Sequence, residues 1–154
     1  MPNWSGGILT TKGQALQAKV DAGQTTLTVT KMKIGSGVLP SGQTLQALND
    51  LVTPELVVPI SNVSASGNIT TITGVITNTG VTNGFSVREL GTFAQDPTLG
   101  EILYSITIDS APDYFPPEGG AVTVSEEFAM NIVVSNTDSV TASISPTGLV
   151  TVRF

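Results

Sequence analysis

The sequence leaves carboxylates as its candidate catalytic groups, because its 154 residues contain no histidine and no cysteine. Those two residue types supply the usual base at neutral pH and the commonest protein ligands of zinc. A pair of Asp or Glu side chains can still hydrolyse a glycosidic bond, so a carboxylate glycosidase stays open. No Gly-x-Ser-x-Gly elbow is present. Gly35-Ser36-Gly37 lacks the Lys and Ser/Thr of a phosphate loop, so only a turn is predicted there.

Glu89 is the carboxylate in the most unusual setting, since it alternates with Phe85, Val87 and Phe93 in an apolar row. A carboxylate on such a face must be paired or must accept backbone hydrogen bonds. It is either a buried anchor, which holds the N-terminal loop or the start of a helix, or a general acid with a raised pKa. We favour the structural anchor, because no second carboxylate is placed to work with Glu89.

Arg88 points to the opposite face and is the only basic residue between Ile34 and Val152, a stretch that holds eleven acidic residues. It is either a sharp contact in an interface or the partner of Asp109 or Glu101 on a neighbouring strand. The intramolecular pair is favoured. With a formal net charge of −6 and no cluster of Lys and Arg, the chain is not predicted to bind nucleic acid.

The segment 109–120 is predicted to be a loop that carries Tyr114 and Phe115 between prolines. Aromatic side chains held by prolines lose little entropy on binding, so this loop is a candidate docking surface. A loop folded back on its own domain is the alternative. Its acidic residues do not have the spacing of a calcium loop. Trp4, the only tryptophan, is predicted to pack against the sheet, with insertion into a partner protein as the other interpretation.

These residues must be positioned by an α+β fold, with two short N-terminal helices packed on a mainly antiparallel β-sheet or sandwich. The first helix is predicted over 8–23, with Thr10 or Thr11 as its cap and Gly23 at its left-handed end. The second helix, over 45–51, repeats leucine at helical spacing. Beyond it the hydrophobic period becomes two residues, which indicates strands.

Strands are predicted wherever β-branched and apolar residues alternate with polar ones. Pro59 lies inside one such run and predicts an edge strand or a bulge there. Ser66-Gly67-Asn68 predicts a hairpin turn. The predicted strands cover 25–34, 56–64, 69–78, 85–95, 101–109, 122–135 (the longest), 140–145 and 149–154.

The alternation also predicts three apolar rows that form one core, covered by Leu16 and Val20 of the first helix. The rows are Val122, Val124, Phe128, Met130, Ile132 and Val134; Ile102, Tyr104, Ile106 and Ile108; and Phe85, Val87 and Phe93.

Hydrophobic residues make up 40% of the chain and charged residues only 12%, about half the usual share of charge. Either partners cover part of the surface, or the hydroxyls of a Thr- and Ser-rich β protein solvate it. No secretory signal and no apolar run of membrane-spanning length is present, so the protein is predicted to be made and kept in the cytoplasm until assembly. No cofactor, metal or small-molecule substrate is predicted.

Eight short segments occur in a distinctive order. They are Asn3-Trp4, Leu9-Thr-Thr-Lys-Gly13, the strand 29–34 running into Gly35, Phe85-Ser-Val-Arg-Glu-Leu-Gly-Thr-Phe-Ala94, Ile102-Leu-Tyr104, Asp113-Tyr-Phe-Pro-Pro117, Val133-Val-Ser-Asn136 and Val140-Thr-Ala142. Together they resemble the N-terminal domain of phage tail-collar fibre proteins. The resemblance implies a structural virion component that attaches a tail fibre to baseplate wedge proteins of a contractile phage tail or phage-like particle, as a homotrimer, with receptor-binding parts downstream.

On this interpretation, residues 1–145 form the attachment domain and 146–154 a C-terminal strand or the start of the fibre connection. At the end of the chain Val150, Val152 and Phe154 form an apolar row, with Leu149, Thr151 and Arg153 opposite. An apolar strand with a free edge favours pairing, so this row is the candidate trimer interface. The alternative function is a carbohydrate-binding β-sandwich module involved in host recognition.

Overall fold

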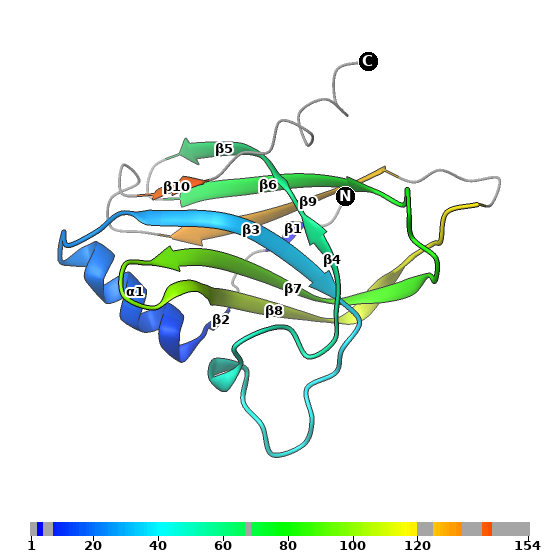
Figure 1. The fold of residues 1–154 in the computed structure, drawn as a ribbon, viewed down its shortest axis with the longest axis horizontal. Helices are drawn as coiled ribbons and strands as arrows, with labels where there is room; N and C mark the ends of the chain where they lie inside the picture. Colours follow the sequence, from blue (N-terminus) through cyan, green and yellow to red (C-terminus); the bar gives the residue numbers. More distant parts are fainter. Residues whose placement is uncertain (1–2, 5–7, 67–68, 120–124, 134–139, 143–154) are drawn as a thin grey trace.

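Two β-sheets and one α-helix make up the part of the chain that the computed structural model describes, residues 3–4, 8–66, 69–119, 125–133 and 140–142 (Figure 1). The helix is α1 (Thr11–Asp21), and η1 (Leu45–Ala47) is a single 3-10 turn. The strands are β1 (Asn3–Trp4), β2 (Ile8–Leu9), β3 (Leu27–Gly35), β4 (Pro54–Val58), β5 (Ile60–Ser66), β6 (Ile69–Thr77), β7 (Phe85–Asp96), β8 (Gly100–Phe115), β9 (Ser125–Val133) and β10 (Val140–Ala142).

The two sheets differ in size. The four-stranded sheet has the order β1-β9-β6-β5, and the six-stranded sheet has the order β10-β3-β7-β8-β2 with β4 also paired to β3. All pairs are antiparallel except β1 with β9 and β10 with β3, so the predicted mainly antiparallel architecture is confirmed. Pro59 separates β4 in one sheet from β5 at the edge of the other, as expected for a residue that cannot donate to a ladder.

Helix α1 has the predicted cap and the predicted glycine ending, but it is shorter than the predicted 8–23, since residues 8 and 9 belong to β2. Thr10 is the cap, and its hydroxyl accepts a hydrogen bond from the Gly13 amide at 2.9 Å. Gly23 has a φ of +75°, and the Gly23 and Gln24 amides donate to Val20 and Lys19 carbonyls, which is a Schellman ending. Leu16 and Val20 are buried in the core, as predicted.

The predicted second helix is wrong, because only η1 forms within 45–51. The isolated segment is too short to nucleate a helix by itself. The Asp50 side chain accepts a hydrogen bond from the Leu51 amide at 2.8 Å, and such local bonds compete with helix formation. Downstream, the Val52 and Thr53 amides are bound to Glu89.

The predicted loop over 109–120 is also wrong in its first half. Strand β8 is the longest described strand and runs to Phe115, where Phe85 pairs with Phe115 and Ser86 with Tyr114. The pairing is irregular, since Arg88 alone lies opposite the four residues 109–112. The proline in that segment removes one ladder donor but does not end the strand. Strand β9 is described over Ser125–Val133, and the rest of the predicted strand 122–135 lies outside the described residues.

Two β-bulges break the predicted apolar rows, because each extra residue turns the following side chains to the other face of the strand. On β7 the register shifts between Val87 and Glu89. Phe85 and Val87 therefore face the core between the sheets, whereas Glu89 and Phe93 face outward. On β8 the shift at Tyr104 has the same effect, so Ile106 leaves the row of Ile102 and Tyr104. Of the predicted row on β9, only the Phe128 side chain is described, and it is buried.

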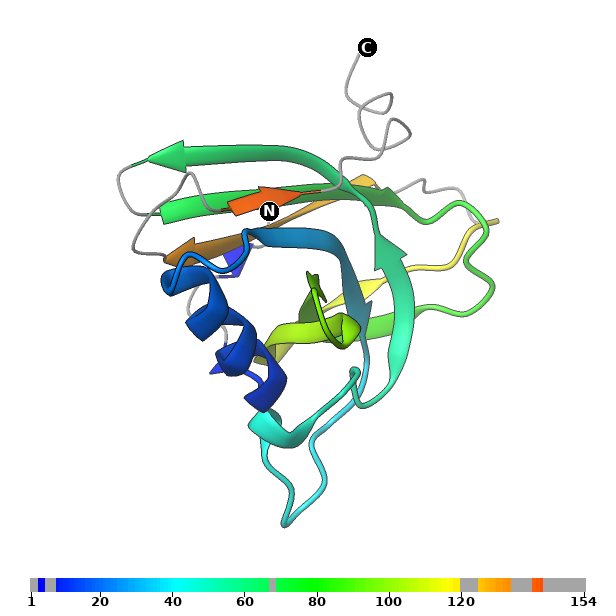
Figure 2. The ribbon, with the colours of Figure 1, turned by 60° about the vertical axis from the view of Figure 1, so that its left-hand side comes forward.

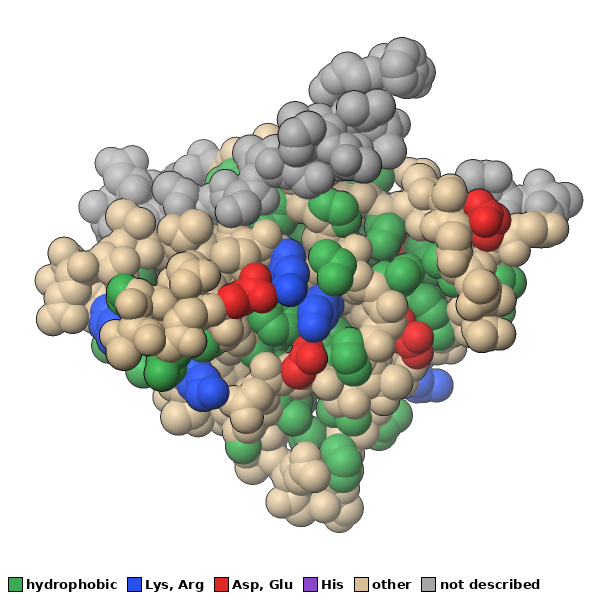
Figure 3. Space-filling model, in the orientation of Figure 1, with side chains coloured by type: hydrophobic (Ala, Val, Ile, Leu, Met, Phe, Trp, Pro, Cys, Tyr) green, Lys and Arg blue, Asp and Glu red, His purple; other side chains and the backbone are tan. Residues whose placement is uncertain are grey.

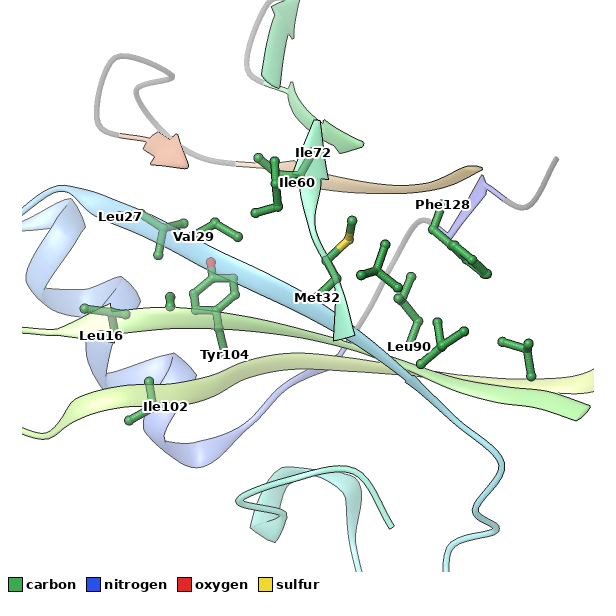
Figure 4. Packing of buried hydrophobic residues seen from close by; sticks show 14 of the residues in the cluster. Leu16, Leu27, Val29, Met32, Ile60, Ile72, Leu90, Ile102, Tyr104 and Phe128 are labelled. Carbon is green, nitrogen blue, oxygen red and sulfur yellow. The ribbon is translucent and has the colours of Figure 1, made fainter. Parts of the chain in front are cut away.

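The main core lies between the sheets, and Figure 4 shows Leu16, Leu27, Val29 and Tyr104 at its helix end. A second, smaller cluster lies on the outer face of the six-stranded sheet. It consists of Leu51, Phe93, Leu103 and Ile106, against which Leu45 and Leu48 pack. The connection 36–53 supplies the three leucines and lies beyond the six-stranded sheet from the four-stranded one (Figure 2). No helix in the described ranges is long and apolar enough to cross a membrane.

Candidate functional site

Glu89 is completely buried and its carboxylate is bound by three backbone amides. The Val52 amide donates to Oε1 at 2.8 Å, and the Gly37 and Thr53 amides donate to Oε2 at 3.0 and 2.8 Å. Hydrogen bonds from amides compensate for the lost hydration of a buried charge. The bulge at Arg88 aims Glu89 at this side of the sheet, so the segment that it binds is 37–53, not the N-terminal loop or helix start that the sequence suggested.

The turn at residues 35–37 is shaped by this carboxylate. A Cβ atom added to Gly35 would lie 2.5 Å from Glu89 Oε2 and 2.4 Å from the Thr53 carbonyl oxygen. A Cβ at Gly37 would lie 2.7 Å from the same carboxylate oxygen and 2.6 Å from the Thr53 nitrogen. The two glycines thus allow the backbone to close around Glu89, whereas their sequence predicted only a turn.

The contacts of Glu89 fix the cover of the outer cluster. Its amide partners lie at both ends of the connection 36–53, and Leu45, Leu48 and Leu51 lie between them. The Ser36 amide also donates to the Thr53 carbonyl at 3.1 Å, which closes the base of the connection. We call Glu89 with its three amides the carboxylate clamp. That Glu89 is a structural anchor stays a prediction. The clamp suggests how Glu89 would act, by holding both ends of the connection 36–53.

Asp96 is a second buried carboxylate that sequence analysis did not single out. Its Oδ1 accepts the Thr98 and Leu99 amides at 2.8 and 3.0 Å, and Lys19 Nζ of α1 lies 3.1 Å away. Burial raises its pKa, but the two amides and Lys19 outweigh burial, so the pKa of Asp96 lies below its ordinary value. The Asp-Pro-Thr-Leu-Gly spacing is the signal that could have revealed this turn.

Helix α1 is attached to β8 at the bulge on Tyr104. The Thr10 hydroxyl donates to the Leu103 carbonyl, and the Thr10 amide donates to the Tyr104 carbonyl at 3.1 Å. A Cβ on Gly13 would lie 2.0 Å from that same Tyr104 oxygen, so the close approach needs glycine. Burial, with a further contribution from Asp21, raises the pKa of Tyr104 to about 12, and its hydroxyl donates to Gln17.

Lys31 and Lys33 lie over the ring of Phe93, with Nζ atoms 5.4 and 4.9 Å from its centroid. Lys31 pairs with Glu101 at 3.0 Å and Lys33 with Asp50 at 3.3 Å. Figure 3 shows such basic and acidic side chains intermixed on the centre of this face. A hydrogen bond from Thr30 lowers the pKa of Glu101 against the opposing effect of burial, and Lys31 lowers it further. The lysines are thus neutralised within the domain.

Arg88 has no ion pair with a carboxylate that the structure describes. Glu101, one of its two expected partners, is opposite Gln95 at the other end of β7 and binds Thr30 and Lys31 instead. The Asp109 side chain lies outside the described part. A pair with Glu101 is therefore wrong, because the antiparallel register of β7 and β8 places Glu101 at the other end of β7 from Arg88.

The candidate interface residues divide into different groups. Phe115 is completely buried, with its ring centroid 5.5 Å from that of Phe85, so its assignment to an interface is corrected to the core. Tyr114 is 62% exposed. The backbone of Trp4 is paired with β9, and nothing is described of its side chain. Val150, Val152 and Phe154 lie outside the described residues, as does the boundary near residue 145.

Glu89 and Asp96 are buried and satisfied by amides, and their side chains point into packed structure. No group of three or more acidic residues that could hold a metal ion occurs among the described side chains. Of the aromatic side chains described, Tyr114 alone is exposed, so they offer no aromatic platform for a sugar.

Comparison with known proteins gives one match. A family model described as phage tail-collar fibre protein, N-terminal, matches residues 1–153. No curated protein and no solved structure matches the chain.

Proposed function

The chain belongs to the phage tail-collar fibre protein family, in its N-terminal part, and we propose that it attaches a tail fibre to the baseplate of a contractile tail or phage-like particle. The observation that supports the proposal is the family match over residues 1–153. Family membership gives the chain a structural role in a phage tail fibre and a place in the virion tail. Attachment to a baseplate, the contractile type of the tail and the identity of the partner proteins go beyond family membership and are our proposal.

The proposed mechanism is the burial of a preformed surface against another protein, without bond chemistry. The two sheets, the carboxylate clamp and the Asp96 turn each fix backbone segments before any partner arrives. A prefixed surface loses little conformational entropy on docking, so more of the contact energy appears as affinity. Glu89 and Asp96 have no catalytic partner among the described side chains, which supports a structural role without enzyme activity.

Self-association is the second part of the proposal. We propose that three copies associate through 149–154, with Val150, Val152 and Phe154 on the shared side. Three chains of a fibre must be in register before a shaft can follow, and an apolar terminal strand could set that register. The experiment is sedimentation equilibrium at several protein concentrations, with a chain that ends at residue 145 as the comparison. A trimer that persists without 146–154 would contradict this assignment.

The test of attachment uses assembled particles. The gene is deleted in the source strain, and particles are compared by electron microscopy with those from a strain that carries the gene with a small epitope tag. We expect density and immunogold label at the junction of fibre and baseplate, and particles without fibres after deletion. Normal fibres in the deletion strain, or label elsewhere on the particle, would contradict the proposal. A glycan array with no binding would exclude the carbohydrate-binding alternative.

A further inference from the structure

The connection between β6 and β7, on the right in Figure 1, contains two asparagines in opposite settings. Asn78 is buried, and its Nδ2 atom donates to the Pro117 carbonyl at 3.2 Å. Asn83 is exposed, lies in a bend and is followed by Gly84. No other asparagine in the chain precedes a glycine. The two asparagines therefore differ in exposure and in the residue that follows, the two features that govern the chemical stability of an asparagine.

Asparagine is a thermolabile residue type, because the backbone nitrogen of the next residue can reach its side-chain carbonyl carbon and close a ring. A side chain on that next residue crowds the ring. Glycine leaves the ring uncrowded, and its backbone rotates most freely into the geometry that the attack needs. Asn83 and Gly84 are thus the pair at which this reaction is easiest in the chain.

Packing against Tyr114 makes glycine necessary at position 84. A Cβ atom added to Gly84 would lie 2.0 Å from the Tyr114 hydroxyl oxygen and 2.9 Å from the Phe115 carbonyl oxygen. Both distances are shorter than the contacts that Cβ atoms make in proteins, so the phenol ring takes the place that a side chain would need. The fold itself therefore imposes the second member of the labile pair.

The backbone is fixed on either side of Asn83 but has no regular structure at the bend itself. The Val81 carbonyl accepts an amide hydrogen bond at 2.8 Å, and β7 begins at Phe85. Residues 82–84 between these two points belong to no helix or strand. Exposed segments of this kind open locally at little cost in free energy. The Asn83 side chain can therefore turn towards the Gly84 nitrogen while both sheets stay folded.

We infer that Asn83 is a site of spontaneous deamidation in the folded domain. The Gly84 nitrogen loses its proton to solvent and bonds to the Asn83 Cγ atom. The Cγ–Nδ2 bond then breaks, and Nδ2 takes up a proton from solvent and leaves as ammonia, so that a succinimide ring remains. Water opens the ring at either of its carbonyl carbons. The product is an aspartyl residue at position 83, or an isoaspartyl residue in which the backbone runs through the former side chain.

The modification changes both the charge and the backbone beside Tyr114. Either product adds one negative charge, because a neutral amide becomes a carboxylate. The isoaspartyl product also adds one atom to the main-chain path directly before β7, where Phe85 pairs with Phe115. The reaction consumes only water and needs no partner protein, so it is independent of the proposed function.

The experiment incubates the purified full chain in mildly alkaline buffer made with heavy-oxygen water, in the native state and in urea. Tandem mass spectrometry of its peptides measures the loss of amide nitrogen and the uptake of heavy oxygen at each asparagine over time. We expect Asn83 to react first in both states, with a native rate within about tenfold of the rate in urea, because the bend opens at little cost. Asn78, in the same connection, should keep its amide in native protein. Asn83→Gln is the matched control and should stay unmodified, since its longer side chain would have to close a larger ring.

Anion exchange gives a second readout, because the modified protein carries one more negative charge and should elute later than the starting protein. Asn83→Gln should give no such later form. If native Asn83 keeps its amide, or reacts more than about tenfold more slowly than in urea, the fold protects it and the inference is overturned. Earlier reaction of another asparagine in native protein, or a later-eluting form whose Asn83 amide is intact, would also overturn it.

Discussion

Glu89 and Asp96 are both buried carboxylates on β7, yet they connect very different parts of the chain. Asp96 binds amides two and three residues ahead of it and one lysine of α1, so most of its partners are local. Glu89 has no cationic partner among the described side chains and binds amides 36 to 52 residues away. Asp96 therefore stabilises a turn that its local sequence already favours, whereas Glu89 holds the long connection 36–53 in place.

The largest expected effect comes from Glu89→Ala. It leaves the Gly37, Val52 and Thr53 amides without an acceptor, at about 1 kcal/mol or more each, so the free energy of unfolding should fall by about 3 kcal/mol. Urea unfolding followed by circular dichroism measures this. Glu89→Gln, which keeps the shape and one acceptor oxygen, should lose less. Wild-type stability in the alanine variant would show that the clamp is not an anchor.

The next effect is expected from Gly37→Ala, which leaves the carboxylate in place and fills the space around it. The new methyl group would lie 2.7 Å from Glu89 Oε2 and 2.6 Å from the Thr53 nitrogen, so the connection must shift. We expect a loss of about 1–3 kcal/mol, as for other overpacked sites. Ser36→Ala is the control in the same turn and should cost less, since its partner Glu55 is exposed. Equal melting temperatures for both variants would contradict the proposed fit.

Asp96→Asn should have a smaller effect that depends on pH. Asn can keep the two amide bonds but loses the charge interaction with Lys19, so a loss of about 1 kcal/mol is expected at pH 7. Because folding lowers the pKa of Asp96, its stabilisation is complete above the unfolded pKa of about 4 and is lost as pH falls through the folded value. Unfolding of both proteins at pH 7 and pH 3 should show the difference shrinking with acid. A difference that grows at pH 3 would reverse the assigned sign.

Lys19→Gln should have the smallest effect of the series. The Lys19 side chain is 30% exposed, and removing a partly exposed partner costs about 0.5 kcal/mol or less, although the Asp96 side chain is buried. The measurement is the melting temperature at low and at high salt, where the deficit should narrow as salt screens the wild-type pair. A loss as large as that of Glu89→Ala would mean that the two carboxylates do not differ as proposed.

Local features of the fold could be predicted from the sequence. Thr10 and Gly23 bound the helix because capping and left-handed conformations depend on neighbouring residues. The position of most strands followed from the period-two pattern, and Pro59 correctly predicted a sheet edge. The second helix failed because a segment as short as 45–51 does not nucleate a helix by itself, and the Asp50 side chain accepts the Leu51 amide instead.

The site could be predicted only in part, because bulges are not visible in an alternating pattern. Glu89 stood out correctly as an acid in an apolar strand, but the shift at Arg88 puts it on the face opposite to Phe85. Its partners come from another part of the chain, and no local spacing encodes them. Tyr114 and Phe115 looked equivalent as neighbours, yet a strand sends them to opposite faces, one exposed and one buried.

The ladders at the two ends of the sequence bear on how the chain can fold as it is synthesised. Asn3 pairs with Ala129, and Leu27 pairs with Val140, so residues that are made early pair with residues that are made much later. Contacts of such high sequence separation are slow to form, and early strands wait with open edges that can pair with the wrong chain. We therefore expect that the ribosome releases most of this domain before its sheets close, and that many copies made at once are prone to mispairing during that interval.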